Sequence, residues 1–179
     1  MKTLTKKASE MTLKELASYI DYSVLKPEFT EKEIIDLTKD GVKLGCATIC
    51  INPGYMDLCE PYVKGSDTML CPVCDFPFGT SSTESKVKQI EIVAKYDSVK
   101  EVDIVANFGM IRSGKYDEVT ADLKACVEAA HKYGREIKVI FETDALNEEQ
   151  AFNILEENPY KQISSTNVRN NLKDEIILK

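Results

Sequence analysis

The sequence has no tryptophan, one histidine (His131) and no apolar run that approaches the roughly 20 residues of a membrane-spanning helix. A single imidazole excludes metal cages built from several histidines and disfavours a histidine-centred catalytic triad. The first eleven residues carry lysines but no apolar stretch, so we expect no secretory signal and a cytoplasmic protein. The GxGxxG and GxxxxGK[ST] motifs are also missing, which removes both common fingerprints of nucleotide-binding α/β sheets.

Basic residues are fewer than acidic ones, 23 against 30, which gives a net charge of −7 at pH 7. This charge disfavours general binding to a nucleic-acid backbone, so we expect neither a nucleic-acid nor a membrane partner. Apolar residues make up 43% of the chain and charged residues 30%, a balance typical of a globular domain with a buried core.

The six cysteines have two interpretations. In a long, core-rich chain without an export signal they are expected to be reduced thiols. Cys71 and Cys74 have the spacing of a redox pair or of half a zinc site, and this alternative stays open. Because both lie in an apolar run, we favour small core side chains and predict no metal.

Short apolar runs alternate with longer amphipathic segments, a pattern typical of successive βα units. The expected strands cover residues 23–25, 46–51, 69–74, 102–106 and 137–141. The expected helices cover residues 12–19, 30–45, 55–63, 84–96, 116–133 and 148–157, and loops are expected at 75–83 and 107–115. Such a series forms either an open doubly wound sheet or a (β/α)8 barrel, and composition alone does not choose between them.

Five segments, in chain order, resemble motifs of the deoxyribose-phosphate aldolase family. Residues 21–27 resemble D-H-T-x-L-K-P, 50–53 resemble C-V-N-P, 76–79 resemble the end of G-F-P-x-G, 101–109 resemble E-[IV]-D-x-V-x-N-x-G, and 138–143 resemble K-V-I-x-E-T. The similarity extends over about residues 16–150. Two positions depart from it: Tyr22 stands where the family has histidine, and Asp75 where it usually has glycine.

The resemblance implies an α/β fold of the (β/α)8 TIM-barrel family, present here as an incomplete barrel of five to six βα units. Residues 1–166 are expected to form one partial barrel domain, and 167–179 a divergent tail. The implied activity is a class I aldolase that splits 2-deoxyribose 5-phosphate into glyceraldehyde 3-phosphate and acetaldehyde. The reaction proceeds through a lysine Schiff base, so no cofactor or metal is expected, and the implied partner is a small sugar phosphate.

Asp103 interrupts an otherwise apolar strand, and the resemblance makes it the proton-relay acid and base of the reaction. Lys138, on the next expected strand, is either its ion-pair partner or a reactive amine, and pairing is favoured. The resemblance also implies that Asp21 and Cys50 contribute to substrate binding, although Cys50 fits a packing role as well.

The Schiff-base lysine of the family, in K-T-S-T-G, has no counterpart in the run 163–167, where Ile163 replaces it. Lys161 is a displaced candidate, two residues earlier. No glycine follows Gly134, so no glycine-lined phosphate site is expected. We therefore predict a C-terminally truncated or diverged, poorly active aldolase; the alternative is a non-catalytic barrel remnant or partner subunit. Because an unclosed barrel exposes strand edges, we expect a homo-oligomer.

Overall fold

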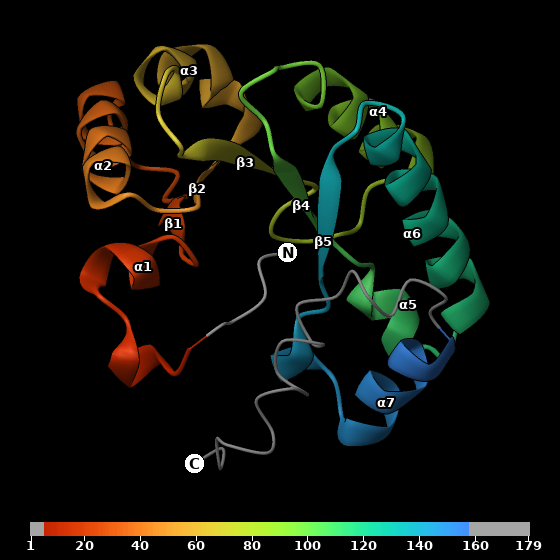
Figure 1. Ribbon diagram of the computed structural model, residues 1–179. Coiled ribbons are helices and arrows are strands. Elements are labelled where there is room, and N and C mark those ends of the chain that lie inside the picture. Colours follow the sequence, from red (N-terminus) through yellow and green to blue (C-terminus); the bar gives the residue numbers. More distant parts are fainter. Residues whose placement is uncertain (1–5, 158–179) are drawn as a thin grey trace. The chain divides into compact units, whose positions relative to one another are not determined.

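The computed structural model describes residues 6–157 and divides into two compact units. The first unit comprises the chain up to Val73 together with Lys95–Glu101, and the second comprises Cys74–Ala94 together with the chain from Val102 onward. Five parallel strands follow one another in sheet order as they do in sequence, β1-β2-β3-β4-β5 (Figure 1). A doubly wound sheet reverses its strand order at a switch point, whereas a barrel does not. The unreversed order confirms the barrel family.

In the first unit, parallel strands alternate with short helices on one side of the sheet. Its strands are β1 (Asp21–Val24), β2 (Thr48–Ile51) and β3 (Met69–Cys74), whose last residue belongs to the second unit. Its helices are α1 (Leu13–Ala17), α2 (Glu31–Leu44) and α3 (Met56–Val63), with 3-10 turns η1 (Ala8–Glu10) and η2 (Pro53–Tyr55). Helix α2 packs against α3, β1 and β2.

Local capping explains where two of these helices begin. Thr12 and Thr30 each accept a hydrogen bond from the backbone N–H three residues later, and the carboxylates of Glu15 and Glu33 each accept one from the backbone N–H of the cap residue. These reciprocal bonds satisfy backbone donors that the first helical turn leaves unpaired. Helix α2 ends at Gly45, whose φ of 76° is left-handed. The predicted start and end of α2 are confirmed.

The second unit contains two strands and the longest helix. Its elements are α4 (Thr83–Val93), β4 (Glu101–Val105), α5 (Phe108–Arg112), α6 (Tyr116–His131), β5 (Glu136–Ile140), η3 (Thr143–Ala145) and α7 (Glu148–Glu157); Glu101 belongs to the first unit. Helix α6 packs against α4, α5, α7 and β5 (Figure 1). This packing buries an apolar stripe of α6: Val119, Leu123, Val127 and Ala130.

Each expected strand and helix within residues 6–157 is present, with ends that differ by up to three residues. The predicted loop over 107–115 is wrong in one respect, because it contains α5. Asn107 caps this helix by accepting a hydrogen bond from the Met110 N–H at 3.1 Å. The turn formers Asn107, Gly109 and Gly114 concealed a helix of only five residues. The expected sixth unit and the tail over 167–179 lie outside the described residues.

Within residues 6–157, none of the helices has the length and apolar character needed to cross a membrane.

Candidate active site

The centre of the candidate site in the second unit is an ion pair between two neighbouring strands. Lys138 Nζ of β5 lies 3.0 Å from Asp103 Oδ1 of β4. Their side chains are 18% and 13% exposed, so both charges are largely removed from water. The structure thus brings together two of the residues that the sequence singled out.

The surroundings of Asp103 explain why it needs a partner. Val102, Ile104 and Val105 of the same strand are fully buried, and an isolated carboxylate in such surroundings is costly. An ion pair requires the ammonium form of lysine, which has no lone pair for attack on a carbonyl. The geometry therefore favours pairing and proton transfer for Lys138 over the role of nucleophile.

A second charged group, which the sequence analysis missed, lies under the carboxyl end of β4. Lys86 of α4 is 0% exposed and donates a hydrogen bond to Asp122 Oδ2 of α6 at 2.7 Å. Its Nζ also donates to the Val105 carbonyl at 3.3 Å and lies 3.7 Å from Asp75 Oδ2. We call Lys86, Asp75 and Asp122 the Lys86 network.

A sequence signal for this network did exist. Lys86 occupies a position of the buried stripe of α4 that continues with Ile90 and Val93, and Asp122 lies in the buried stripe of α6 beside Leu123 and Cys126. Opposite charges in the apolar stripes of two helices indicate a buried pair, because single buried charges are rarely tolerated.

Asp75 explains one departure from the family motif. Its φ is 49°, in the left-handed region that glycine adopts at the least cost. The Asp75 carboxylate accepts hydrogen bonds from the Ser81 N–H at 3.0 Å and the Ser81 hydroxyl at 2.7 Å. Aspartate is among the side chains that tolerate this conformation, and here it closes the loop over residues 75–81.

In the first unit, Asp21 and Cys50 lie at different levels of neighbouring strands. Asp21 pairs in register with Thr48, whose hydroxyl donates to Asp21 Oδ1 at 2.7 Å, while Cys50 pairs with Ser23. Asp21 is thus two residues, about 6.6 Å, nearer the amino end of the sheet than Cys50. Cys50 is buried in an apolar cluster with Cys71, Val73 and the partly buried Leu25. Their roles in substrate binding stay predictions.

Tyr22, the other departure from the family motif, belongs to the helix side of β1. A Cβ added at Gly41 of α2 would lie 3.2 Å from the Tyr22 ring. Because side chains alternate along a strand, Tyr22 points away from the side on which Asp21 and Ser23 lie. The tyrosine therefore fills space against α2.

The structure contradicts a redox or zinc pair at Cys71 and Cys74. Residues three apart on a strand face opposite sides, and Cys71 packs with Cys50 while Cys74 interacts with Cys126. Burial, followed by nearby negative charge, raises the pKa of both Cys74 and Cys126 to about 12. All six cysteines are buried and none of them forms a disulfide.

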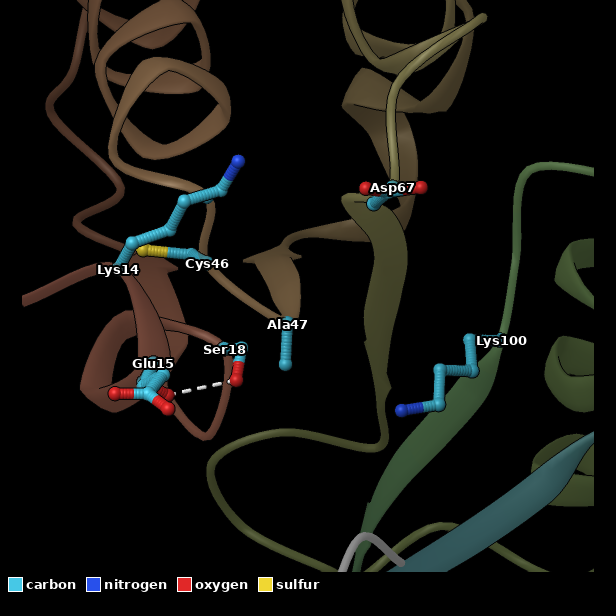
Figure 2. Close-up of a pocket in the computed structure, with 8 residues that line it drawn as sticks. Lys14, Glu15, Ser18, Cys46, Ala47, Asp67 and Lys100 are labelled. Carbon is cyan, nitrogen blue, oxygen red and sulfur yellow. Dashed lines mark hydrogen bonds between the residues drawn. The ribbon is translucent and has the colours of Figure 1, made fainter. Parts of the chain in front are cut away.

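A cleft of about 530 Å³ lies at the amino end of the strands in the first unit. Cys46 and Ala47 precede β2, while Asp67 and Lys100 belong to the segments that lead into β3 and β4 (Figure 2). Barrel enzymes place their reacting groups at the opposite, carboxyl ends of the strands. The cleft is therefore separate from the candidate site. Lys161, the displaced Schiff-base candidate, lies outside the described residues.

Comparison with known proteins shows which proteins this chain resembles. No family model matches the chain. A deoxyribose-phosphate aldolase from Desulfitobacterium hafniense is 43% identical over 140 residues, which cover 78% of this chain and 64% of the relative. One from Clostridium kluyveri is 39% identical over 141 residues, covering 78% and 63%. A solved aldolase named QR15 superimposes with a TM-score of 0.72 at 34% identity, covering 81% of this chain and 65% of its own.

The chain thus spans less than two thirds of the length of these curated relatives. This chain carries the Asp103–Lys138 pair, the loop over residues 75–81 and the unreversed strand order described above. By sequence and by fold, this chain is similar to members of the deoxyribose-phosphate aldolase family.

Proposed function

We propose that this chain is a deoxyribose-phosphate aldolase-like protein that acts on 2-deoxyribose 5-phosphate, with Asp103 as the group that moves protons. The observation that carries the proposal is the 3.0 Å ion pair between Asp103 and Lys138 inside an apolar strand environment. A carboxylate held in place by a fixed cation is suited to exchange protons with a water or hydroxyl group beside it.

The proposed reaction breaks the bond between carbons 2 and 3 of the open-chain sugar. A lysine amine first attacks the carbon 1 aldehyde and loses water to form an iminium ion. Loss of the proton on the carbon 3 hydroxyl then sends the bonding electrons into the iminium, which gives an enamine and releases glyceraldehyde 3-phosphate. Protonation of the enamine and hydrolysis release acetaldehyde and restore the amine. Asp103 takes up and returns the protons of these steps.

The nucleophile is the weak part of this site. Lys138 is engaged with Asp103, and Lys161 stands two residues before the position at which the family motif has its lysine. A displacement of two residues along the chain is enough to slow a reaction that depends on close approach. We therefore propose slow turnover.

The second candidate function is that of a non-catalytic barrel subunit. The observation that favours it is Ile163, which stands in place of the lysine in the run that resembles K-T-S-T-G. Such a subunit keeps the fold and the Asp103–Lys138 pair but forms no adduct with an aldehyde.

We further propose self-association and a cytoplasmic location. The strand β1 has one neighbour in the described sheet, and unpaired strand edges favour association with another chain. No disulfide joins any of the six cysteines, which fits a reducing compartment.

Trapping the imine tests the two candidate functions. The full chain is incubated with acetaldehyde, reduced with borohydride and weighed intact, so that an adduct adds one ethyl group to one lysine. Peptide mapping then locates the modified lysine. Lys138→Met and Asp103→Asn are compared with Lys88→Met, which removes an exposed lysine of α4.

The aldolase proposal expects a slow adduct on Lys161 that persists in Lys138→Met. It also expects adduct formation to slow by about a hundredfold in Asp103→Asn, the lower range for loss of a general acid or base. Lys88→Met should behave as the unsubstituted chain. A folded protein without any adduct establishes the non-catalytic subunit instead, and an adduct on Lys138 overturns the ion-pair role of that residue.

A further inference from the structure

Among the described residues of the second unit, the Lys86 network is a buried charged cluster that the proposed reaction does not use. Lysine is almost never fully buried unless it is paired. Lys86, at 0% exposure, is compensated by Asp122 at 2.7 Å, by the Val105 carbonyl at 3.3 Å and by Asp75 at 3.7 Å. These contacts join α4 to α6, to β4 and to the loop after β3.

On its helix side, the network fixes α4 against α6. Asp122 accepts hydrogen bonds from the Lys86 ammonium and, at 2.7 Å, from the Thr83 hydroxyl. Both donors lie on α4, three residues apart and therefore on the same face. One carboxylate thus holds the first turn of α4, and Lys86 cannot move without leaving Asp122 uncompensated.

On its loop side, the network fixes residues 75–81. Asp75 binds Ser81 through its side chain and accepts the Gly79 N–H at its carbonyl, 2.9 Å away. The Asp75 N–H donates to Gln89 Oε1 of α4 at 2.9 Å. The loop is therefore closed on itself and attached to the helix that carries Lys86.

The network and the loop both act on the carboxyl end of β4. Lys86 holds the Val105 carbonyl, and a Cβ added at Gly79 would lie only 2.3 Å from the Ala106 oxygen. The Ala106 N–H in turn donates to the Ile140 carbonyl of β5 at 2.9 Å. Val105 and Ile140 each lie two residues beyond a member of the Asp103–Lys138 pair, on the same face of their strands.

We propose that Lys86 is a positioning residue for the Asp103–Lys138 pair. Lys86 holds the Val105 carbonyl and, through Asp75, the loop over residues 75–81. It thereby fixes the position of Asp103 on β4 relative to Lys138 on β5. This inference rests on the proposed function, in which Asp103 moves protons. Without the ammonium, Asp75 and Asp122 are two adjacent, poorly solvated carboxylates, and the loop and the end of β4 shift to separate or hydrate them.

Two variants of the full chain test this proposal. Lys86→Met removes the charge, and Lys86→Met/Asp122→Asn removes the buried pair as a unit, which relieves much of the destabilisation that a single unpaired carboxylate causes. Lys88→Met, an exposed lysine of the same helix, is the matched control for the loss of one positive charge. Thermal unfolding verifies that each variant is folded.

The first measurement follows the carboxyl carbon resonance of Asp103 through a pH titration. When Lys138 is held less closely, its cation stabilises the Asp103 carboxylate less, so the titration midpoint moves to higher pH in both Lys86 variants. The second measurement is the exchange of acetaldehyde methyl protons with deuterium from solvent, which reports enamine formation. We expect exchange to slow by about tenfold in both Lys86 variants, as misplacement of a reacting group does.

The double variant separates positioning from stability. A folded Lys86→Met/Asp122→Asn protein with the Asp103 midpoint of the unsubstituted chain overturns the proposal. So does Lys88→Met if it shifts the midpoint as much as Lys86→Met. Absence of methyl-proton exchange in the unsubstituted chain contradicts the proposed function, and the titration of Asp103 then decides the role of Lys86 alone.

Discussion

Replacement of Gly79 by alanine offers a measurable test of how closely the loop over residues 75–81 approaches β4. Gly79 has a φ of 67°, and an alanine in the left-handed region costs about 1–2 kcal/mol. The new Cβ would lie 2.3 Å from the Ala106 oxygen and 2.9 Å from Val105 Cγ1. Overpacking of this kind costs about 1–3 kcal/mol more. The free energy of unfolding should therefore fall by about 2–5 kcal/mol, a large part of the 5–15 kcal/mol or so typical of a domain.

Gly134 supplies a matched control for the backbone term. Its φ is 69°, and nothing lies within 4 Å of an added Cβ. Gly134→Ala should thus carry the cost of the left-handed backbone without the steric cost. Urea unfolding of both variants, followed by circular dichroism, isolates the close approach as the difference between them.

The result that refutes the reasoning is equality of the two variants. If Gly79→Ala loses no more stability than Gly134→Ala, the loop does not lie against Ala106 and cannot transmit the position of Lys86 to β4. Gly54→Ala completes the series, because that glycine has neither a positive φ nor a neighbour within 4 Å of an added Cβ. It should leave the unfolding midpoint almost unchanged.

Three further expectations concern caps, charges and thiols. Thr30→Ala should lower the free energy of unfolding by about 1 kcal/mol, because it removes the acceptor for the Glu33 N–H, and urea titration measures this loss. Lys138→Met should cost about 3 kcal/mol because it removes the cation from a largely buried ion pair, and Lys138→Met/Asp103→Asn should recover part of that loss in the same titration. Burial raises the pKa of Cys74 and of Cys126 from 9.0 to about 12, so the unfolded chain loses these protons at lower pH than the folded chain. The free energy of unfolding should therefore fall as the pH rises from 9 to 12. In Cys74→Ala/Cys126→Ala the unfolding midpoint should depend less on pH over this range.

Features that depend on neighbours in the chain could be predicted from the sequence. The Thr30 capping box and the Gly45 helix end involve residues within one helix, and both occur where the pattern places them. Continuous apolar runs predicted strands buried on both faces, and β2 is buried at every position. The short helix α5 was not predicted, because the turn-forming residues in and around its five residues indicate a loop.

The charged contacts of the second unit join residues distant in sequence. Lys86 and Asp122 are 36 residues apart, and neither segment alone indicates which partner the other will meet. The Asp103–Lys138 pair was foreseen because both residues interrupt apolar strands that a βα series makes neighbours. The Lys86 network was not foreseen because a lysine on a helix is ordinarily a solvated residue, and only packing against α6 removes it from water.

The Asp103–Lys138 pair and the Lys86 network call for different explanations. In the proposed reaction a carboxylate moves protons beside the substrate, so that proposal accounts for Asp103 and its partner. A fully buried Lys86 is not needed for stability, since apolar side chains of similar volume often replace a buried ion pair without loss. Geometry therefore explains the presence of Lys86 at the end of β4 better than stability does. Its ammonium contacts a helix, a loop and a strand end at one point, and apolar contacts would fix the relative positions of these segments less closely. The same reasoning predicts that the Lys86→Met/Asp122→Asn protein folds well but holds Asp103 in the wrong place.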